Sequence, residues 1–515
     1  AIIRRCLNVL LLMHTNSHDI VTFYHQHVTA GSFAISDAAD GRSITGDALG
    51  SLIVGAANRL RVAGLGPGDR VLFMDGQGLS AFVHFWATVL LGGVFVSVDT
   101  SWPLARIAST CLRLCPTVAV VPAAVLAGFQ TRLPDLPLLS ANELASGQST
   151  FVPADMPADA AAAFLLTSGS TGEPKIVVHG RDALLRSARL AVETFDWRGG
   201  ERLLNLPEPH TMSGLRNAML AAPMAGMSWV SAAVEQRSNL FALCDLLATH
   251  RIQRLVAAPM LLRQINLQGA RLNPSTLASL KAVYCTGADL HIEEVDRFHA
   301  RYGIPVINYY GLTETVGLCL SQRIESWQPG DRSLGWPVGC RVRLMAADGQ
   351  EAKPGVSGEL QIEMPLPMQR YLEDPVATAQ RFDGQWLRTG DLAYRDGDDR
   401  ITLTGRASAF INTVHTEKIY PGEIESALEQ LPGVAQAAVF GLPDAAGGER
   451  IAALIVPLSD ASPEDLAPQR LAVGVREILG PSRVPVAFRC VADLPRSSND
   501  KLLRHALAAI FEHAH

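Results

Sequence analysis

Residues 164–175 read FLLTSGSTGEPK, and the segment opens with an apolar run. Glycine lets backbone N–H groups turn toward an anion, while hydroxyl groups and a lysine add donors and charge. The residues that suit a phosphate ligand are Thr167, Ser168, Gly169, Ser170, Thr171, Gly172 and Lys175. We therefore predict a phosphate-binding loop directly after a buried strand.

This loop differs from the Walker loop of the kinase-like NTPases. The Walker loop requires a lysine followed by serine or threonine, whereas Lys175 precedes Ile176 here. A segment rich in Ser, Thr and Gly is also typical of an ordinary polar loop. The phosphate interpretation therefore depends on further motifs.

A second polar segment, NYYGLTET at residues 308–315, follows the apolar Val306 and Ile307. Its residue types suit a nucleotide: an amide for the adenine edge, a flat ring for stacking, a hydroxyl for a phosphate and a carboxylate for Mg²⁺. We assign these roles, in that order, to Asn308, Tyr310, Thr313 and Glu314. The alternative is a capped turn after a strand, with the tyrosines in the core.

Three further segments follow along the chain. WLRTGD at residues 386–391 ends in a carboxylate that can accept two hydroxyl donors, although Gly-Asp is also typical of a turn. The pair Gly405-Arg406 precedes PGEIE at residues 421–425, whose proline and glutamates suit a helix N-terminus. LPRSSNDK at residues 494–501 ends in Lys501.

These segments resemble, in order, the motifs of the adenylate-forming superfamily, which includes acyl-CoA synthetases, nonribosomal-peptide adenylation domains and luciferase. Five motifs in the family's order are much less expected by chance than any one of them. The resemblance spans residues 20–505. It implies that a carboxylic acid attacks the α-phosphorus of ATP, so that pyrophosphate leaves and an acyl-adenylate remains.

The resemblance also implies roles for single residues. Lys501 bridges the carboxylate and the α-phosphate, while Lys175 and a Mg²⁺ ion held by Glu314 neutralise charge. Asp391 accepts hydrogen bonds from the ribose hydroxyls. The other nucleotide-binding residues that it implies are Gly287, Ala288, Tyr309, Gly311 and Arg406.

The segment PEPHTMSG at residues 207–214 resembles the PLxHxxG segment of acyl-CoA synthetases, in which the histidine ring borders the acyl pocket. The pocket residues implied in this way are His210, Ser213, Gly214, Gly287 and Gly311. Amino-acid-activating members place an aspartate near the position of Thr211. A simple α-amino acid is therefore disfavoured as the substrate, but the acid itself is not specified.

The sequence specifies the acyl acceptor less closely than it specifies the adenylation step. The position that matches the family's interdomain hinge is Ser408, and His415 stands where thioester-forming members usually keep a glycine for pantetheine. Asp500 replaces the family glycine before Lys501. The acceptor could be CoA, the phosphopantetheine of a separate carrier protein, or an amine.

Three hypotheses follow for function. The first is a stand-alone acid:thiol ligase that uses CoA or a carrier protein. The second is an adenylate-forming enzyme that transfers the acyl group to a non-thiol acceptor or stops at the acyl-adenylate. The third is a nucleotide-binding scaffold without catalysis, which Lys501, Glu314 and Asp391 disfavour.

The composition limits the function further. The chain has 515 residues, 48% of them hydrophobic, and a net charge of −6. This balance argues against a nucleic-acid partner, and no apolar stretch approaches the ~20 residues needed for membrane insertion. The eight cysteines form no CxxC pair, which fits a reducing cytoplasm.

Apolar runs alternate with amphipathic stretches and predict an α/β fold with layered, mostly parallel sheets. The runs are 71–74, 94–98, 117–121, 162–166 and 254–258. The resemblance adds a small barrel-like part and a small mobile α+β domain at the C-terminus. We place the N-terminal adenylation core at residues 1–404 and the C-terminal lid, which carries the catalytic lysine, at residues 405–515.

Overall fold

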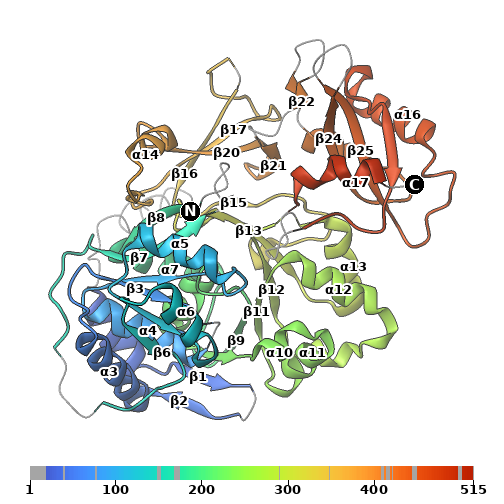
Figure 1. Ribbon diagram of the computed structural model, residues 1–515. Coiled ribbons are helices and arrows are strands. Elements are labelled where there is room, and N and C mark those ends of the chain that lie inside the picture. The colour runs from blue at the N-terminus through green and yellow to red at the C-terminus, as the bar shows by residue number, and fades with distance from the viewer. Residues whose placement is uncertain are drawn as a thin grey trace.

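The computed structural model describes residues 19–38, 41–75, 78–147, 152–167, 174–288, 290–346, 348–406, 411–412, 418–419, 421–443, 449–496 and 502–513. Two large sheets with helices, a smaller antiparallel sheet and a C-terminal α+β part make up these residues (Figure 1). This architecture confirms the predicted fold class.

The first large sheet has seven strands and contains the phosphate-loop strand. Its order is β18 (Arg370–Tyr371), β8 (Lys175–Gly180), β7 (Ala161–Thr167), β4 (Val94–Ser97), β3 (Arg70–Phe73), β5 (Val118–Val121) and β6 (Leu138–Ser140). The strands from β7 to β6 are parallel, and β8 and β18 add an antiparallel edge. The predicted apolar runs between residues 71 and 166 are all strands of this sheet.

The second large sheet has nine strands. Its order is β15 (Trp336–Pro337), β14 (Gly317–Ser321), β13 (Val306–Leu312), β12 (Ala282–Cys285), β11 (Arg254–Ala257), β9 (Arg202–Asn205), β10 (Ser228–Ser231), β1 (Ala34–Asp37) and β2 (Ser43–Thr45). The strands from β13 to β1 are parallel, whereas β14, β15 and β2 are antiparallel. Because parallel strands present their carboxyl ends at one edge, Cys285 and Asn308 lie side by side as a register pair.

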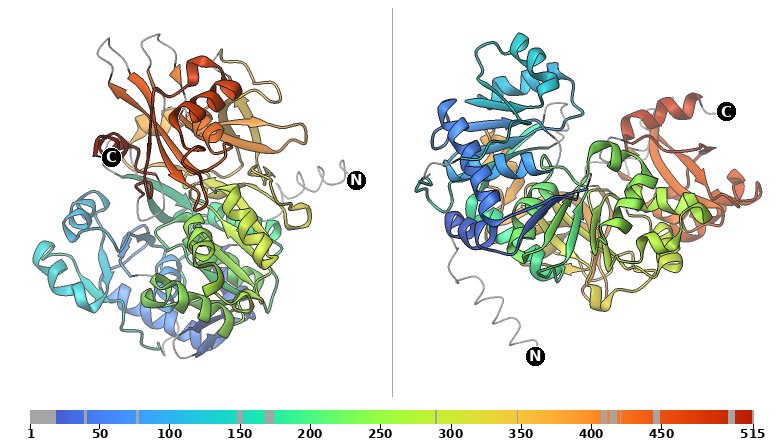
Figure 2. Two further views of the ribbon diagram at one scale, coloured as in Figure 1. Left: turned by 90° about the vertical axis from the view of Figure 1, so that its right-hand side faces the viewer. Right: turned by 90° about the horizontal axis from the view of Figure 1, so that it is seen from below.

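Helices pack between and around the two large sheets (Figure 2). Helix α4 (Leu79–Leu90) is buried at every residue from Ala81 to Leu90, as expected for a helix that is apolar all round. It shares one hydrophobic cluster with residues of both sheets. The other principal helices are α3 (Gly46–Val62), α5 (Leu104–Leu114), α6 (Leu126–Arg132), α7 (Arg181–Thr194), α11 (Leu240–Thr249), α12 (Pro259–Gln268), α13 (Ile292–Tyr302) and α14 (Pro375–Arg381).

A five-stranded antiparallel sheet follows and corresponds to the predicted barrel-like part. It consists of β16 (Arg341–Met345), β17 (Gly358–Glu363), β20 (Trp386–Arg395), β19 (Phe382–Asp383) and β21 (Ile401–Arg406). In the pairing of β20 with β21, Asp391 lies opposite Arg406. Two predicted nucleotide-binding residues therefore meet across one strand pair.

The C-terminal part is built on β24 (Val434–Pro443), β25 (Glu449–Pro457) and β26 (Ala487–Cys490). Helices α15 (Pro421–Leu428) and α16 (Pro468–Leu479) share one cluster with this sheet, and α17 (Leu507–His513) shares another. A short pair, β22 (Ile411–Asn412) and β23 (Lys418–Ile419), lies nearby. Among the described residues, no helix combines the length and the apolar character needed to cross a bilayer.

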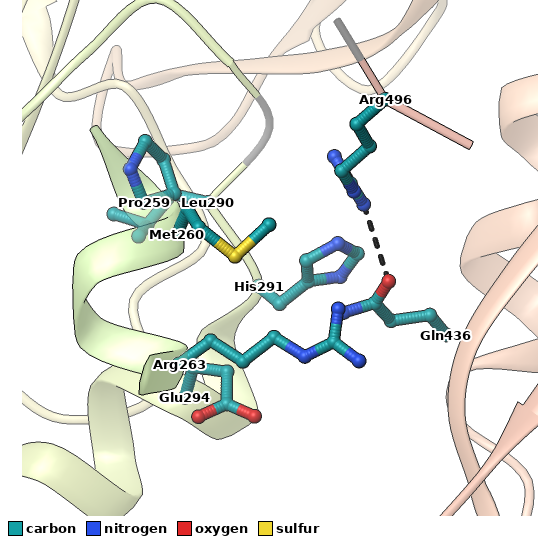
Figure 3. Close-up of a pocket in the computed structure, with 8 residues that line it drawn as sticks. All are labelled: Pro259, Met260, Arg263, Leu290, His291, Glu294, Gln436 and Arg496. Atoms are coloured by element: carbon teal, nitrogen blue, oxygen red, sulfur yellow. Dashed lines mark hydrogen bonds between the residues drawn. The ribbon is translucent and has the colours of Figure 1, made fainter. Parts of the chain in front are cut away.

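The C-terminal part touches α12 and α13 of the larger part. Arg263 Nη1 lies 2.8 Å from Asp493 Oδ1, and His291 Nδ1 lies 3.5 Å from Glu429 Oε1. A narrow pocket of about 20 Å³ separates the two parts here (Figure 3). One water needs about this much room, so the pocket is too small for an acid or a nucleotide.

Candidate active site

The strand before the predicted phosphate loop lies where the sequence indicated, and a second strand, which the sequence analysis did not predict, follows the loop. Thr167 ends β7, Lys175 begins β8, and the two residues pair in antiparallel register. The strand before the loop is therefore confirmed. Several predicted site residues lie outside the described residues: Ser168, Gly169, Ser170, Thr171, Gly172, Ser408, His415, Asp500 and Lys501.

Lys175 and Glu314 both contact Tyr371, one at the ring and the other at the hydroxyl. Lys175 Nζ is 4.7 Å from the centroid of the Tyr371 ring, and the Tyr371 hydroxyl donates to Glu314 Oε1 at 2.6 Å. Arg381 Nη2 donates to the same oxygen at 3.1 Å. Burial, followed by the charge of Glu314, raises the pKa of Tyr371, so the hydroxyl keeps its proton and remains a donor.

This arrangement fits a magnesium site that is completed by the substrate. Mg²⁺ is typically bound by one or two carboxylates together with substrate phosphates and water. Within the described part of the chain, no group of three His, Cys, Asp or Glu side chains forms a metal cage. Tyr371 and Arg381 fix Glu314 through Oε1, and no hydrogen bond from a described residue occupies Oε2. Glu314 can therefore offer Oε2 to a cation that ATP carries.

The predicted ribose carboxylate, Asp391, is 3% exposed and lies between two polar partners. The Tyr310 hydroxyl donates to Asp391 Oδ2 at 2.5 Å, and Arg406 Nε lies 2.7 Å from Oδ1. Burial and the adjacent carboxylate raise the pKa of Tyr310 well above its usual value, which keeps it a donor. The structure thus brings together three residues that the sequence placed in separate motifs.

The remaining nucleotide residues lie at the carboxyl ends of β12 and β13. Asn308 donates its backbone N–H to Gln322 Oε1 at 3.0 Å, and Gly287 has φ +92°, which suits glycine. Tyr309 is buried, with its ring 5.1 Å from that of Phe195, so it belongs to the core. The carboxyl ends of β12 and β13 also hold Ala288, Gly311 and Thr313.

His210 lies between two acidic side chains. Its Nδ1 is 3.5 Å from Glu208 Oε2, and its Nε2 is 4.0 Å from Asp99 Oδ2. Arg237 Nη1 holds the other oxygen of Glu208 at 2.9 Å. The Thr211 hydroxyl accepts a hydrogen bond from the Gly214 N–H at 3.1 Å and begins the short helix that contains Ser213.

Gly214 has a direct steric role in this segment. A Cβ added at Gly214 would lie 1.9 Å from the carbonyl oxygen of Glu208. No side chain fits so close to a backbone oxygen, so glycine is required for the turn that presents His210.

Comparison with known proteins identifies the family. Residues 24–372 match the AMP-binding enzyme family, and residues 423–501 match the AMP-binding enzyme C-terminal domain. The chain belongs to the AMP-binding enzyme family. The second match ends at Lys501.

Several curated AMP-binding enzymes are similar to this chain. The sulfoacetate–CoA ligase of Cupriavidus necator is 34% identical over 390 residues, which are 75% of this chain and 72% of the ligase. The fatty acid–[acyl-carrier-protein] ligase ScoC of Streptomyces coeruleorubidus is 27% identical over 512 residues, covering 91% of this chain and 92% of ScoC.

Solved structures share the fold. ATP-bound MatB from Rhodopseudomonas palustris has a TM-score of 0.85 at 24% identity, with 95% of this chain and 98% of MatB covered. The amide bond synthetase McbA from Marinactinospora thermotolerans has a TM-score of 0.81 at 25% identity, with coverages of 95% and 98%.

For this AMP-binding enzyme, we expect Asp391→Asn to raise the KM for ATP about 30-fold, because hydrogen bonds to a charged acceptor contribute about 1.5–3 kcal/mol. Initial rates of pyrophosphate release against ATP concentration measure the effect. Asp396→Asn is the matched control, because Asp396 pairs with Arg400 in a turn of the same sheet. An unchanged KM in Asp391→Asn contradicts the ribose role.

Glu208 predicts a pH dependence of stability. Burial opposes its ionisation, but His210 and Arg237 outweigh burial and lower its pKa from 4.5 to about 2. The ionised carboxylate of Glu208 therefore stabilises the folded state fully above pH 4.5, and this stabilisation is lost as the pH falls toward 2. Between pH 7 and pH 4 this loss is about 0.8 kcal/mol. Urea unfolding of Glu208→Gln should show a shallower pH slope than the native enzyme, and parallel slopes contradict the pairing.

Proposed function

We propose that this protein is an AMP-forming acid:CoA ligase. A carboxylate oxygen of the acid bonds to the α-phosphorus of ATP, the bond to pyrophosphate breaks, and an acyl-adenylate forms. A thiolate then bonds to the acyl carbon, and AMP leaves. Two groups of contacts carry the proposal: Lys175, Tyr371 and Glu314 on one side, and Asp391 with Arg406 on the other. Arg381 links them, because it donates to Glu314 and to the carbonyl of Thr389, two residues before Asp391.

The protein's task in the first step is electrostatic and positional, because both reactants are anions. Glu314 would hold a Mg²⁺ ion, and bound Mg²⁺ would neutralise phosphate charge and polarise the phosphoryl oxygens. Lys175 adds a cation over the ring of Tyr371. Asp391 and Arg406 fix the ribose, and His210 and Gly214 border the acyl group. No nucleophilic side chain is required.

The acceptor in the second step is CoA in this proposal. The curated relatives include ligases for sulfoacetate, indoleacetate and 2-succinylbenzoate, each named as a CoA ligase. A carrier-protein thiol is the nearest alternative, because ScoC is named as an acyl-carrier-protein ligase. An amine acceptor is the second alternative, since McbA is named as an amide bond synthetase.

The proposal keeps the two-domain division at residues 404 and 405, with the hinge at Ser408 and the catalytic lysine at Lys501. The proposed boundary falls within strand β21, which ends at Arg406, two residues before the proposed hinge. The cytoplasmic location stays a prediction.

The test is pyrophosphate release with ATP, Mg²⁺ and a panel of carboxylic acids, with and without CoA. Acid-dependent release together with a CoA-dependent thioester supports the ligase. Release with CoA but no thioester directs the acceptor search to a carrier protein or an amine. Absence of release with every acid contradicts the proposal.

A further inference from the structure

Arg216 is a buried cation that lacks a counter-charge. It lies in the π-helical segment η3 (Leu215–Ala221) and is 0% exposed. Its Nε donates to Asn217 Oδ1 at 2.9 Å. Neither Nη1 nor Nη2 has a hydrogen-bond acceptor among the described residues. Single π-helical turns are frequent at functional sites.

The groups around Arg216 form a polar chain that ends at the guanidinium. Asn217 Nδ2 donates to Asn205 Oδ1 at 3.1 Å, and Asn205 Nδ2 donates to the carbonyl of Pro207 at 3.0 Å. No carboxylate in the described part of the chain forms an ion pair with Arg216. Burial lowers the pKa of Arg216, and the groups that oppose this shift are Tyr309 and Cys319 rather than an acid. The guanidinium carbon lies 5.7 Å from the centroid of the Tyr309 ring, a contact that supplies no full negative charge.

A buried charge without a partner is strongly destabilising. Arg254, by contrast, lies 2.9 Å from Glu201. Arg181 is also buried and its Nε and Nη1 lack acceptors among the described residues, but its Nη2 donates to the Val89 carbonyl at 2.8 Å. Arg216 differs from both because Nη1 and Nη2 are both unsatisfied.

Arg216 lies where the two predicted acyl-pocket segments meet. A Cβ built on Gly317 would lie 2.7 Å from Arg216 Nη1 and 2.9 Å from Met212 Cγ. Gly317 opens β14, and Gly311 pairs with the next residue of that strand. Met212 immediately precedes Ser213. The guanidinium therefore faces the junction between the His210 segment and the segment that holds Glu314.

The distance to the proposed chemistry is short. Gly317 is three residues after Glu314, so their Cα atoms are at most about 11 Å apart. A small acid could therefore place one carboxylate near the α-phosphate and a second group near Arg216. Met212 also lies against Gly317, and methionine is unbranched and adaptable.

We propose that Arg216 binds a second anionic group of the substrate, so that the acid is a short one bearing a carboxylate or a sulfonate in addition to the reacting carboxylate. This inference rests on the proposed ligase function. The planar guanidinium fork matches the paired oxygens of such a group, and Nη1 and Nη2 supply both donors. Binding supplies the counter-charge that the protein lacks.

The experiment compares kcat/KM for pyrophosphate release with malonate, succinate and sulfoacetate against propanoate and butanoate. The native enzyme should prefer the doubly anionic acids. Arg216→Met should lower kcat/KM for those acids about 30-fold, as expected for a lost charged hydrogen bond, while propanoate and butanoate keep their rates. Comparing kcat/KM for malonate and succinate with kcat/KM for sulfoacetate shows whether the second anionic group is a carboxylate or a sulfonate.

Arg181→Met is the matched control, because Arg181 is also buried but donates Nη2 to the Val89 carbonyl at 2.8 Å. The ratio of doubly to singly anionic rates should be unchanged in this variant. Arg216→Lys keeps a cation and should retain part of the preference.

The outcomes separate this inference from the proposed function. If none of the acids supports pyrophosphate release, the ligase proposal is wrong. Two outcomes overturn the role of Arg216 but leave the ligase proposal intact. In the first, the native enzyme releases pyrophosphate faster with the singly anionic acids. In the second, Arg216→Met lowers kcat/KM equally for both classes of acid. If circular dichroism shows that Arg216→Met is unfolded, the native preference and Arg216→Lys decide the question.

Discussion

Replacing Glu314 by glutamine is expected to lower the rate of pyrophosphate release at least about 100-fold, the usual cost of removing one electrostatic contact from a transition state. The variant retains the side-chain shape and an oxygen that can accept from Tyr371 and Arg381. It removes the negative charge that would hold Mg²⁺ near the phosphates. The loss should therefore appear in catalysis, with a raised requirement for Mg²⁺.

The measurement is the initial rate of acid-dependent pyrophosphate release over a range of Mg²⁺ concentrations. Glu201→Gln is the matched control: Glu201 is likewise 7% exposed and pairs with an arginine, but Arg254 and Lys281 hold it in the core. That variant should lose stability while its rate per folded molecule is retained. Equal rates for native enzyme and Glu314→Gln contradict the magnesium role.

The sequence predicted the strands well because their signal is local. Each predicted run, such as Val94–Val98, is apolar at nearly every position, as expected for a parallel strand buried on both faces. The order of the motifs then placed Thr167, Asn308 and Asp391 in one site. That prediction did not require knowledge of which strands pair with each other.

Tyr371 and Arg381 were missed for the opposite reason. Tyr371 lies 196 positions after Lys175, and its own neighbourhood carries no pattern that suits a phosphate or a metal. Only the pairing of β18 with β8 brings its ring to Lys175. A contact that depends on sheet topology cannot be inferred from local spacing.

Arg216 shows a second limit. In the sequence it is one charged residue in the apolar run LRNAMLAAPM, and a single arginine in such a run gives no indication of its exposure. The structure shows that the side chain is fully buried and that Nη1 and Nη2 lack acceptors. Arg216 is a candidate for substrate binding because these two nitrogens have no acceptor among the described residues. Only the packing around the side chain reveals this.

The second large effect concerns Lys501. Lys501→Ala should lower the rate of acyl-adenylate formation by at least two orders of magnitude, because the acid and ATP are both anions and this lysine is proposed to bridge them. The second half-reaction does not need that bridge. Thioester formation from a preformed acyl-adenylate and CoA should therefore persist in the variant.

Single-turnover assays of the two half-reactions measure this difference directly. Lys353→Ala is the control for a lost lysine, because Lys353 is exposed in the loop between β16 and β17. An unchanged adenylation rate in Lys501→Ala removes the lysine from the mechanism. Equal losses in both half-reactions would instead indicate that Lys501 supports the C-terminal domain as a whole, since a purely electrostatic bridge acts only where the carboxylate meets the α-phosphate.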